Sequence, residues 1–151
     1  MRNILNRARG VILSLSLLIG APILAIAQID ASSSSTGYSN SLSFDVAINM
    51  EPQFIGNGKL YFVMLHGEQF YLLSETRGFV PYLGAEIPEY KSINRSSETI
   101  SLRNWDTTGQ IGAHIFVGYG SDFFEMLNSG RYKVVSTLAD IRAPAPAPAP
   151  A

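Results

Sequence analysis

Apolar and polar residues alternate along several short segments of the chain, which is the pattern of strands with one face in a core and the other in water. Residues 98–103 alternate in this way, and residues 41–49 do so most clearly. Residues 59–65 are apolar at nearly every position and residues 69–73 follow after a short turn, which predicts a hairpin of two well-buried strands. The apolar positions of the clearest segment are Leu42, Phe44, Val46 and Ile48.

Residues 110–138 have the pattern of strand, glycine turn, short helix, glycine stop and strand, and the other strands are expected to pack against this stretch. Asp122 precedes Glu125 by three residues, which predicts a helix start through a variant of the capping box. Gly130 has no Cβ and is expected to take the left-handed conformation that ends a helix. Residues 132–138 then alternate again as a strand.

Glycines and prolines are closely spaced over residues 74–93, which predicts a loop with one short edge strand. Together the segments amount to six or seven strands and one short helix near the carboxyl terminus. The predicted fold class is all-β, an immunoglobulin-like antiparallel β-sandwich rather than a closed barrel. The sandwich domain is expected to span residues 41–139.

Two segments of low complexity flank this domain. Residues 28–40 contain a run of serines and little apolar surface, so they are predicted to be a flexible leader in which Gly37 would tolerate a side chain. Alanine and proline alternate over residues 143–151, so residues 140–151 are predicted to be an extended, semi-rigid spacer. The spacer would either hold the domain away from a surface or join it to a further module.

Residues 117–138 also carry a resemblance to known proteins. The pattern VGYGxxxxEMLxSGRYKxVxTL resembles the C-terminal motif of a β-rich module that recurs in exported bacterial proteins of uncharacterised function. The resemblance implies export and a β-sandwich, and it brings no catalytic residues. An aromatic residue is expected at the position before Thr137 in this module, and Ser136 stands there instead, which implies looser packing of the last strand.

The amino terminus has the layout of a secretory signal peptide. Three arginines precede an apolar run over residues 11–27, which ends with the small residues Ala25 and Ala27 on either side of Ile26. The alternative is a membrane anchor, but Gly20 and Pro22 interrupt the run. We therefore expect residues 1–27 to be removed and the protein to be secreted or periplasmic.

The chain that remains after this cleavage is mildly acidic. The three arginines are the only charges in residues 1–27, so 8 basic and 12 acidic residues remain, a formal net charge of 8 − 12 = −4. Such a surface argues against nucleic acid as a partner and against a membrane partner after cleavage. The chain contains no cysteine, so the exported fold must hold without disulfides.

Residues with catalytic or metal-binding chemistry are few and scattered. The only histidines are His66 and His114, whereas a zinc site needs three or four ligands. No G-x-S-x-G elbow occurs, so Ser121 has no context that would activate it as a nucleophile. We therefore predict no catalytic residue, no metal and no cofactor.

The acidic residues have ordinary explanations as well. Glu86 and Glu89 are expected on a loop surface, and the Asp122 and Glu125 pair belongs to the helix start, so neither pair indicates a glycosidase. A calcium site around Asp106 and Thr108 is conceivable, but the D-x-D-x-D-G spacing is absent.

Three aromatic residues are the candidate ligand-binding residues. Trp105 is the only tryptophan, and Tyr82 and Tyr90 lie in the proline-rich loop, so the three rings could form a platform on which a sugar or peptide stacks. A solvent-facing Trp105 beside polar groups would favour this binding function, whereas a buried one would favour a role in the core.

Three classes of function follow from these observations. The leading hypothesis is an exported, non-enzymatic module in cell-surface architecture or protein interaction, with another exported protein or surface component as its partner. The alternative is a carbohydrate- or ligand-binding module that uses the loop aromatics, with a glycan as partner. The second alternative is a hydrolase, which needs a cleft with convergent titratable residues.

Overall fold

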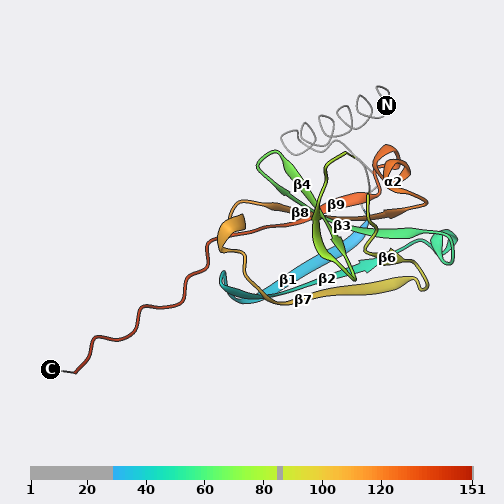
Figure 1. Ribbon diagram of the computed structural model, residues 1–151. Helices are drawn as coiled ribbons and strands as arrows, with labels where there is room; N and C mark the ends of the chain where they lie inside the picture. Colours follow the sequence, from blue (N-terminus) through green and yellow to red (C-terminus); the bar gives the residue numbers. More distant parts are fainter. Residues whose placement is uncertain (1–28, 85–86, 151) are drawn as a thin grey trace.

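The computed structural model describes residues 29–84 and 87–150, which form two antiparallel β-sheets packed face to face (Figure 1). The predicted signal peptide and Glu86 lie outside the described residues. The three-stranded sheet consists of β1 (Asp30–Tyr38), β2 (Ser41–Asn49) and β7 (Ser97–Trp105), in the order β1-β2-β7. The larger sheet has the order β5-β4-β3-β8-β9, and β6 pairs with β3 beside β4.

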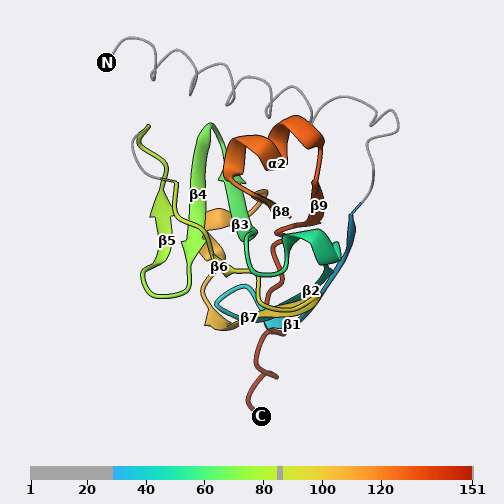
Figure 2. The same cartoon turned by 90° about the vertical axis from the view of Figure 1, so that its right-hand side faces the viewer.

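The strands of the larger sheet are β3 (Lys59–His66), β4 (Gln69–Ser74), β5 (Gly78–Pro81), β6 (Lys91–Ser92), β8 (His114–Gly120) and β9 (Tyr132–Thr137). Helical turns η1 (Pro52–Phe54) and η2 (Thr108–Gln110) lie in connections, and α2 (Phe123–Ser129) joins β8 to β9. Figure 2 shows α2 on the side of the larger sheet that faces away from the three-stranded sheet.

The order of the strands confirms the predicted immunoglobulin-like sandwich with a short helix near the carboxyl terminus. If the strands are lettered along the chain, β1-β2-β7 corresponds to A-B-E and β5-β4-β3-β8-β9 to C″-C′-C-F-G of a variable-type domain. β6 stands at the place of strand D in the chain but pairs with β3 instead of β7. The described residues contain nine strands rather than six or seven, because β1 was not expected and residues 74–93 supply two short strands.

β1 corrects the prediction of a flexible leader at residues 28–40. Its nine residues pair with β2 along their whole length, from Asp30 opposite Asn49 to Tyr38 opposite Ser41. Backbone hydrogen bonds to β2 do not require large side chains, and the small inward residue Ala31 fits against the core with 4% exposure. Packing therefore begins well before residue 41, and the ordered domain includes the serine run.

Two apolar layers explain the different patterns of the strands. Between the sheets, the alternating apolar residues of β2 meet those of β3 and β8, and Phe44 contacts Phe62 edge to face at 6.3 Å. β3 is apolar on both faces because its other face, with Tyr61 and Val63, belongs to a second cluster on the outer side of the larger sheet. Met126 of α2 completes that cluster.

The stretch around α2 forms as the sequence predicts. The Asp122 carboxylate accepts a hydrogen bond from the Glu125 amide at 2.9 Å, and the Glu125 carboxylate accepts one from the Ser121 amide at 3.0 Å. Gly130 ends the helix in the left-handed conformation, with φ 68° and ψ 21°. The preceding strand begins only at His114, because residues 108–110 form η2 and leave Ile111 36% exposed.

Candidate functional site

The three aromatic residues predicted to form a ligand platform do not lie together. Trp105 is partly buried in the core between the sheets, where it stacks on Phe79 at 5.2 Å and contacts Phe44 at 6.0 Å. Tyr90 packs against the same core, whereas Tyr82 packs against the outer cluster of the larger sheet. By the criterion of exposure, Trp105 therefore has a role in the core, and ligand binding by these rings stays a prediction.

Burial also determines the chemistry of these tyrosines. Desolvation raises the pKa of Tyr82 above its ordinary value, and it does the same for Tyr90, where nearby Glu75 adds to the rise. A tyrosine whose pKa is raised stays neutral at physiological pH and serves as packing surface.

The polar residues considered for catalysis or metal binding are engaged in ordinary structural contacts. His114 Nδ1 lies 2.9 Å from the Thr137 hydroxyl, and Glu89 forms an ion pair with Lys59 at 3.2 Å. The Asp106 carboxylate accepts hydrogen bonds from the Thr108 hydroxyl and amide, which hold the pKa of Asp106 below its usual range. Across residues 29–84 and 87–150, no three His, Asp or Glu side chains gather as a metal site requires.

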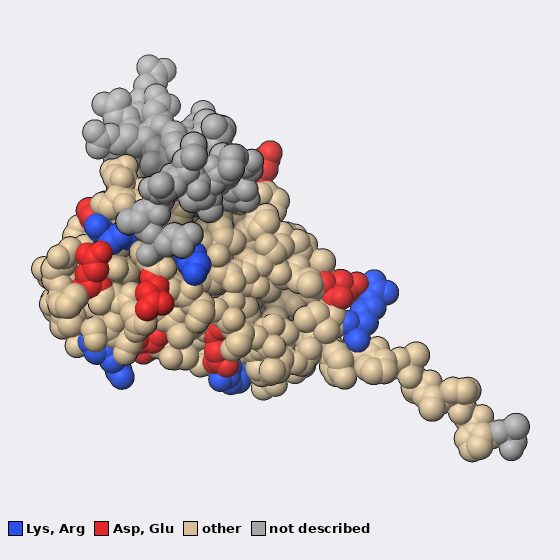
Figure 3. All heavy atoms as spheres, turned by 180° about the vertical axis from the view of Figure 1, so that it is seen from behind, with Lys and Arg blue, Asp and Glu red and all other residues tan. Residues whose placement is uncertain are grey.

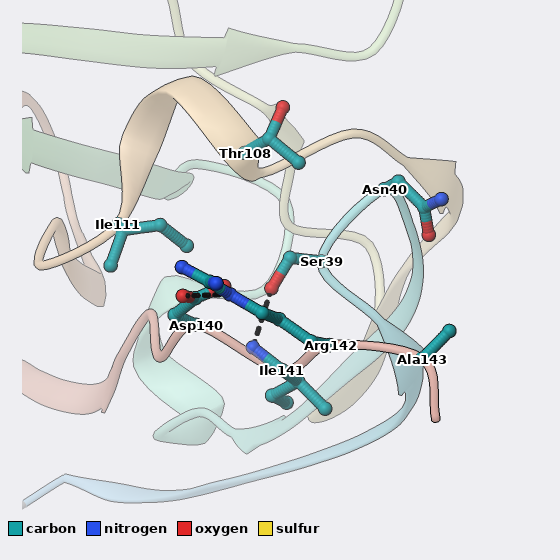
Figure 4. A pocket seen from close by; sticks show the side chains of 8 residues that line it. All are labelled: Ser39, Asn40, Thr108, Ile111, Asp140, Ile141, Arg142 and Ala143. Carbon is teal, nitrogen blue, oxygen red and sulfur yellow. Dashed lines mark hydrogen bonds and ion pairs between the residues drawn. The ribbon is translucent and has the colours of Figure 1, made fainter. Parts of the chain in front are cut away.

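A hollow of about 560 Å³ lies at the end of the sandwich where the chain leaves β9 (Figure 4). It is bounded by the β1–β2 turn, by η2 and by the segment that follows β9. Its lining residues are Ser39, Asn40, Thr108, Ile111, Asp140, Ile141, Arg142 and Ala143.

Ser39 holds this end of the molecule together. Its hydroxyl donates a hydrogen bond to the Ala139 carbonyl at 3.2 Å and accepts one from the Ile141 amide at 2.7 Å. Its backbone amide donates to the Ile141 carbonyl at 2.8 Å, and its carbonyl accepts from the amide and hydroxyl of Thr107. Ser39 and Thr107 are 3% and 1% exposed, so the bond between them is buried, whereas the bonds of the Ser39 hydroxyl to Ala139 and Ile141 are partly buried. We call this set of hydrogen bonds the Ser39 clasp.

The clasp determines what the hollow can do. Because the Ser39 hydroxyl is held by two backbone groups, it is not placed as a nucleophile. Arg142 pairs with Asp140 at 2.7 Å, and the large apolar side chains of the lining are the exposed Ile111 and Ile141. The hollow has the chemistry of a small contact surface rather than of an active site.

A second, more polar hollow of about 290 Å³ lies on the outer face of the three-stranded sheet. Asn49 of β2 and Thr99 of β7 line its floor, and Arg95 and Glu98 form an ion pair of 3.4 Å at its edge. The other lining residues are Ala47, Ile48 and Ser97.

Sequence analysis missed both hollows. The Ser39 clasp joins residues about a hundred positions apart, and the outer face depends on the pairing of β1 with β2. The one signal for β1 in the sequence is the alternation of Ala31, Ser33 and Ser35 with Asp30, Ser32, Ser34 and Thr36. This signal is weak because the residues of the two faces differ little in size and polarity.

Comparisons with known proteins find no match: no family model fits the chain, and no curated protein or solved structure is significantly similar to it. The resemblance of residues 117–138 to an exported bacterial module therefore stays a prediction. None of the helices in the described residues is both long and apolar enough to cross a membrane.

Proposed function

We propose that this chain is an exported, non-enzymatic β-sandwich module that acts in cell-surface architecture or protein interaction. The supporting observation is the Ser39 clasp, which fixes where the Ala-Pro segment leaves the sandwich. The clasp holds the chain as far as Ile141, and the alternating alanines and prolines follow at once. A semi-rigid segment that starts from a fixed point suits a module that is presented at a distance from its attachment.

The proposal assigns no role in hydrolysis. Asp122 and Glu125 are engaged in capping, Glu89 in an ion pair and His114 in a contact with Thr137, and the larger of the two hollows has no residue pair placed as nucleophile and base. The carbohydrate-binding alternative loses the support of a shared aromatic platform, because Tyr82 lies in a different cluster from Tyr90 and Trp105. It gains support from another surface, the outer face of the three-stranded sheet.

Cell fractionation with mass spectrometry tests the proposal. We expect the protein in the periplasm, at the cell surface or in the medium, with its amino terminus at or near Gln28. Gentle lysis should leave much of it attached to the cell envelope, as a role in surface architecture requires. An Ala27→Arg variant, which removes a small residue that signal cleavage needs, should accumulate as the longer precursor. A wild-type chain that keeps residues 1–27, or that stays in the cytoplasm, would contradict the proposal.

A further inference from the structure

The outer face of the three-stranded sheet carries a regular array of short polar side chains. The register of β1, β2 and β7 places residues from all three strands in rows across this face. One row is Asp30, Asn49 and Ser97, the next is Ser32, Ala47 and Thr99, and a third is Ser34, Asp45 and Ser101. Thr36 and Ser43 form a fourth row, which Arg103 joins beside a β-bulge. We call these twelve residues the hydroxyl face.

Polarity alone does not make this face a binding site, because sheets in soluble proteins ordinarily turn polar residues to water. Its distinguishing feature is the size of the side chains. Of the twelve positions only Arg103 is long, and none carries lysine, glutamate or an aliphatic group larger than alanine. Serine and threonine have few rotamers to lose, so ordering them against a ligand costs less entropy than ordering lysine or glutamate.

The charged groups of the face are already held in place. Asp45 pairs with Arg103 at 2.8 Å and accepts a hydrogen bond from Ser101 at 2.5 Å, and these contacts hold the pKa of Asp45 below its usual range. Asn49 donates to Asp30 at 2.6 Å. A hydroxyl-bearing ligand would therefore meet acceptors and donors in a defined arrangement, which reduces the cost of binding.

The balance of charge identifies the kind of ligand. The charges are paired locally: Arg103 forms an ion pair with Asp45 on the face, and Arg95 forms one with Glu98 at the edge of the polar hollow. Asp30 is the one remaining acidic residue of the face, so no strong charge of either sign favours an anionic or a cationic polymer. Figure 3, which shows the molecule from behind, has acidic and basic side chains in small adjacent groups rather than in a large area of one sign. The hydroxyl face has none of the clustered apolar or aromatic anchors that dominate protein interfaces.

The hydroxyl face is a long strip with a distinct feature at each end. The nine residues of β1 extend over about 27 Å, at ~3.4 Å per residue, long enough for several sugar rings. Tyr38, opposite Ser41 in the register, lies at one end of this strip with 42% exposure, where its ring is available for stacking. The polar hollow floored by Asn49 and Thr99 lies toward the other end.

We propose that the hydroxyl face binds a neutral polysaccharide, with sugar hydroxyls exchanging hydrogen bonds with its serines, threonines, Asn49 and Asp30, and with Tyr38 stacking on a ring. This deepens the proposed function, on which it rests, by naming the surface component that the module contacts. Ala47 lies near the centre of the face and is exposed, so a long side chain there would hold a polysaccharide away from the sheet.

The binding test uses the protein as purified from its host, whether or not residues 1–27 have been removed. Its result therefore does not depend on whether the protein is exported. The probes are cellulose, chitin and starch as neutral polysaccharides and alginate as an acidic one. We expect retention on at least one neutral probe, with an affinity that changes less than about twofold between low and high salt because no charges are neutralised.

Ala47→Glu should weaken this retention at least about tenfold, and Ala145→Glu, which adds the same charge to the exposed tail, should leave it unchanged. Tyr38→Ala should weaken it several-fold. A thermal midpoint equal to wild type shows that the Ala47→Glu protein is folded, and Ser32→Gln provides a second, uncharged disruption if it is not. Retention on no neutral probe, retention on alginate alone, or equal retention by the Ala47→Glu and Ala145→Glu proteins would overturn the proposal.

Discussion

Ser39 shows how one small polar residue can join distant parts of a β-sandwich. Its side chain satisfies the Ala139 carbonyl and the Ile141 amide at a partly buried place, and its buried carbonyl satisfies two groups of Thr107. Buried polar groups that lose their partners are costly, so the stability of this end depends on a hydroxyl that the sequence places close to a run of ordinary serines.

The first prediction follows from the clasp. Ser39→Ala should lower the free energy of unfolding by about 1 kcal/mol, because two backbone groups of residues 139–141 lose a hydrogen-bond partner at a partly buried place. Ser35→Ala, on the exposed part of β1, should change it by less than ~0.5 kcal/mol. Denaturant titration measures both changes, and equal midpoints for the two variants would contradict the role of the clasp.

The second prediction concerns Gly130. Gly130→Ala should destabilise the protein by about 1 kcal/mol, since a Cβ is strained at φ 68°. Gly109→Ala is the matched control, because its added Cβ meets nothing within 4 Å and its φ is not in the left-handed region. A loss of stability at Gly109 as large as at Gly130 would argue against the backbone explanation.

The expectation that Gly37 tolerates a side chain is incompatible with the structure. Gly37 has φ +100° in β1, and an added Cβ would lie 2.6 Å from the Ser41 carbonyl oxygen. A substitution there is therefore expected to destabilise the β1–β2 turn, and Gly37 cannot serve as a neutral control.

At the scale of elements, α2 is specified by residues within its own segment, whereas β1 is specified by contacts with distant parts of the chain. The signals for α2 stand within nine residues: the Asp122 cap, its reciprocal Glu125 and the Gly130 stop. β1 has no comparable local signal, because serine has a low preference for strands and little surface to bury. It forms because β2 offers a full-length pairing edge and because Lys133 and Ser33 link it to β9, at 2.7 and 2.6 Å.

The third prediction tests the order of β1. Amide hydrogens of residues 31–38 that pair with β2 should exchange with solvent much more slowly than alanine amides of residues 143–150. Hydrogen exchange read by mass spectrometry of peptides from the two segments makes this comparison. Equal, fast exchange in both segments would restore the flexible leader that the composition suggests.

At the scale of the whole molecule, buried and partly buried tyrosines make the stability of the fold depend on pH in the alkaline range. Burial raises the pKa above the ordinary value of 10.0 for five tyrosines, and Tyr61, between the larger sheet and α2, shows the largest rise. Because the folded protein holds these protons more tightly than the unfolded chain, their contribution to stability is complete below pH 10 and is lost as the pH rises above it. The five are Tyr61, Tyr82, Tyr90, Tyr119 and Tyr132.

The fourth prediction is therefore a loss of stability in alkali. The free energy of unfolding should fall above about pH 10, by up to ~1.4 kcal/mol per pH unit for the buried Tyr61 and by less for the partly buried Tyr82, Tyr90 and Tyr132. Tyr61→Phe should make this fall less steep than in the wild-type protein. Denaturant midpoints between pH 7 and 12 give the slopes, and a profile that is flat to pH 12 in the wild-type protein would contradict the assignment.

Features that depend on near neighbours in the chain could be predicted from the amino-acid sequence alone. Alternation of Leu42, Phe44, Val46 and Ile48 predicted β2, the apolar run of residues 59–65 predicted a strand buried on both faces, and the caps predicted α2. These features follow from side-chain periodicity and from hydrogen bonds within one helix, so a short segment contains what is needed. The sandwich class followed from the number and spacing of such strands.

Contacts between residues far apart in the sequence could be read only from the folded chain. Folding brought Ser39 to residues 139–141, aligned the serines of β1 with β2 and β7 to form the hydroxyl face, and separated Tyr82 from Trp105 onto opposite sides of the larger sheet. A single residue slip in the register of a strand exchanges its two faces, and serine runs carry almost no apolar signal to reveal that register. The candidate surfaces of this protein are made of such residues, and their arrangement depends on backbone pairing between segments that lie far apart in the sequence.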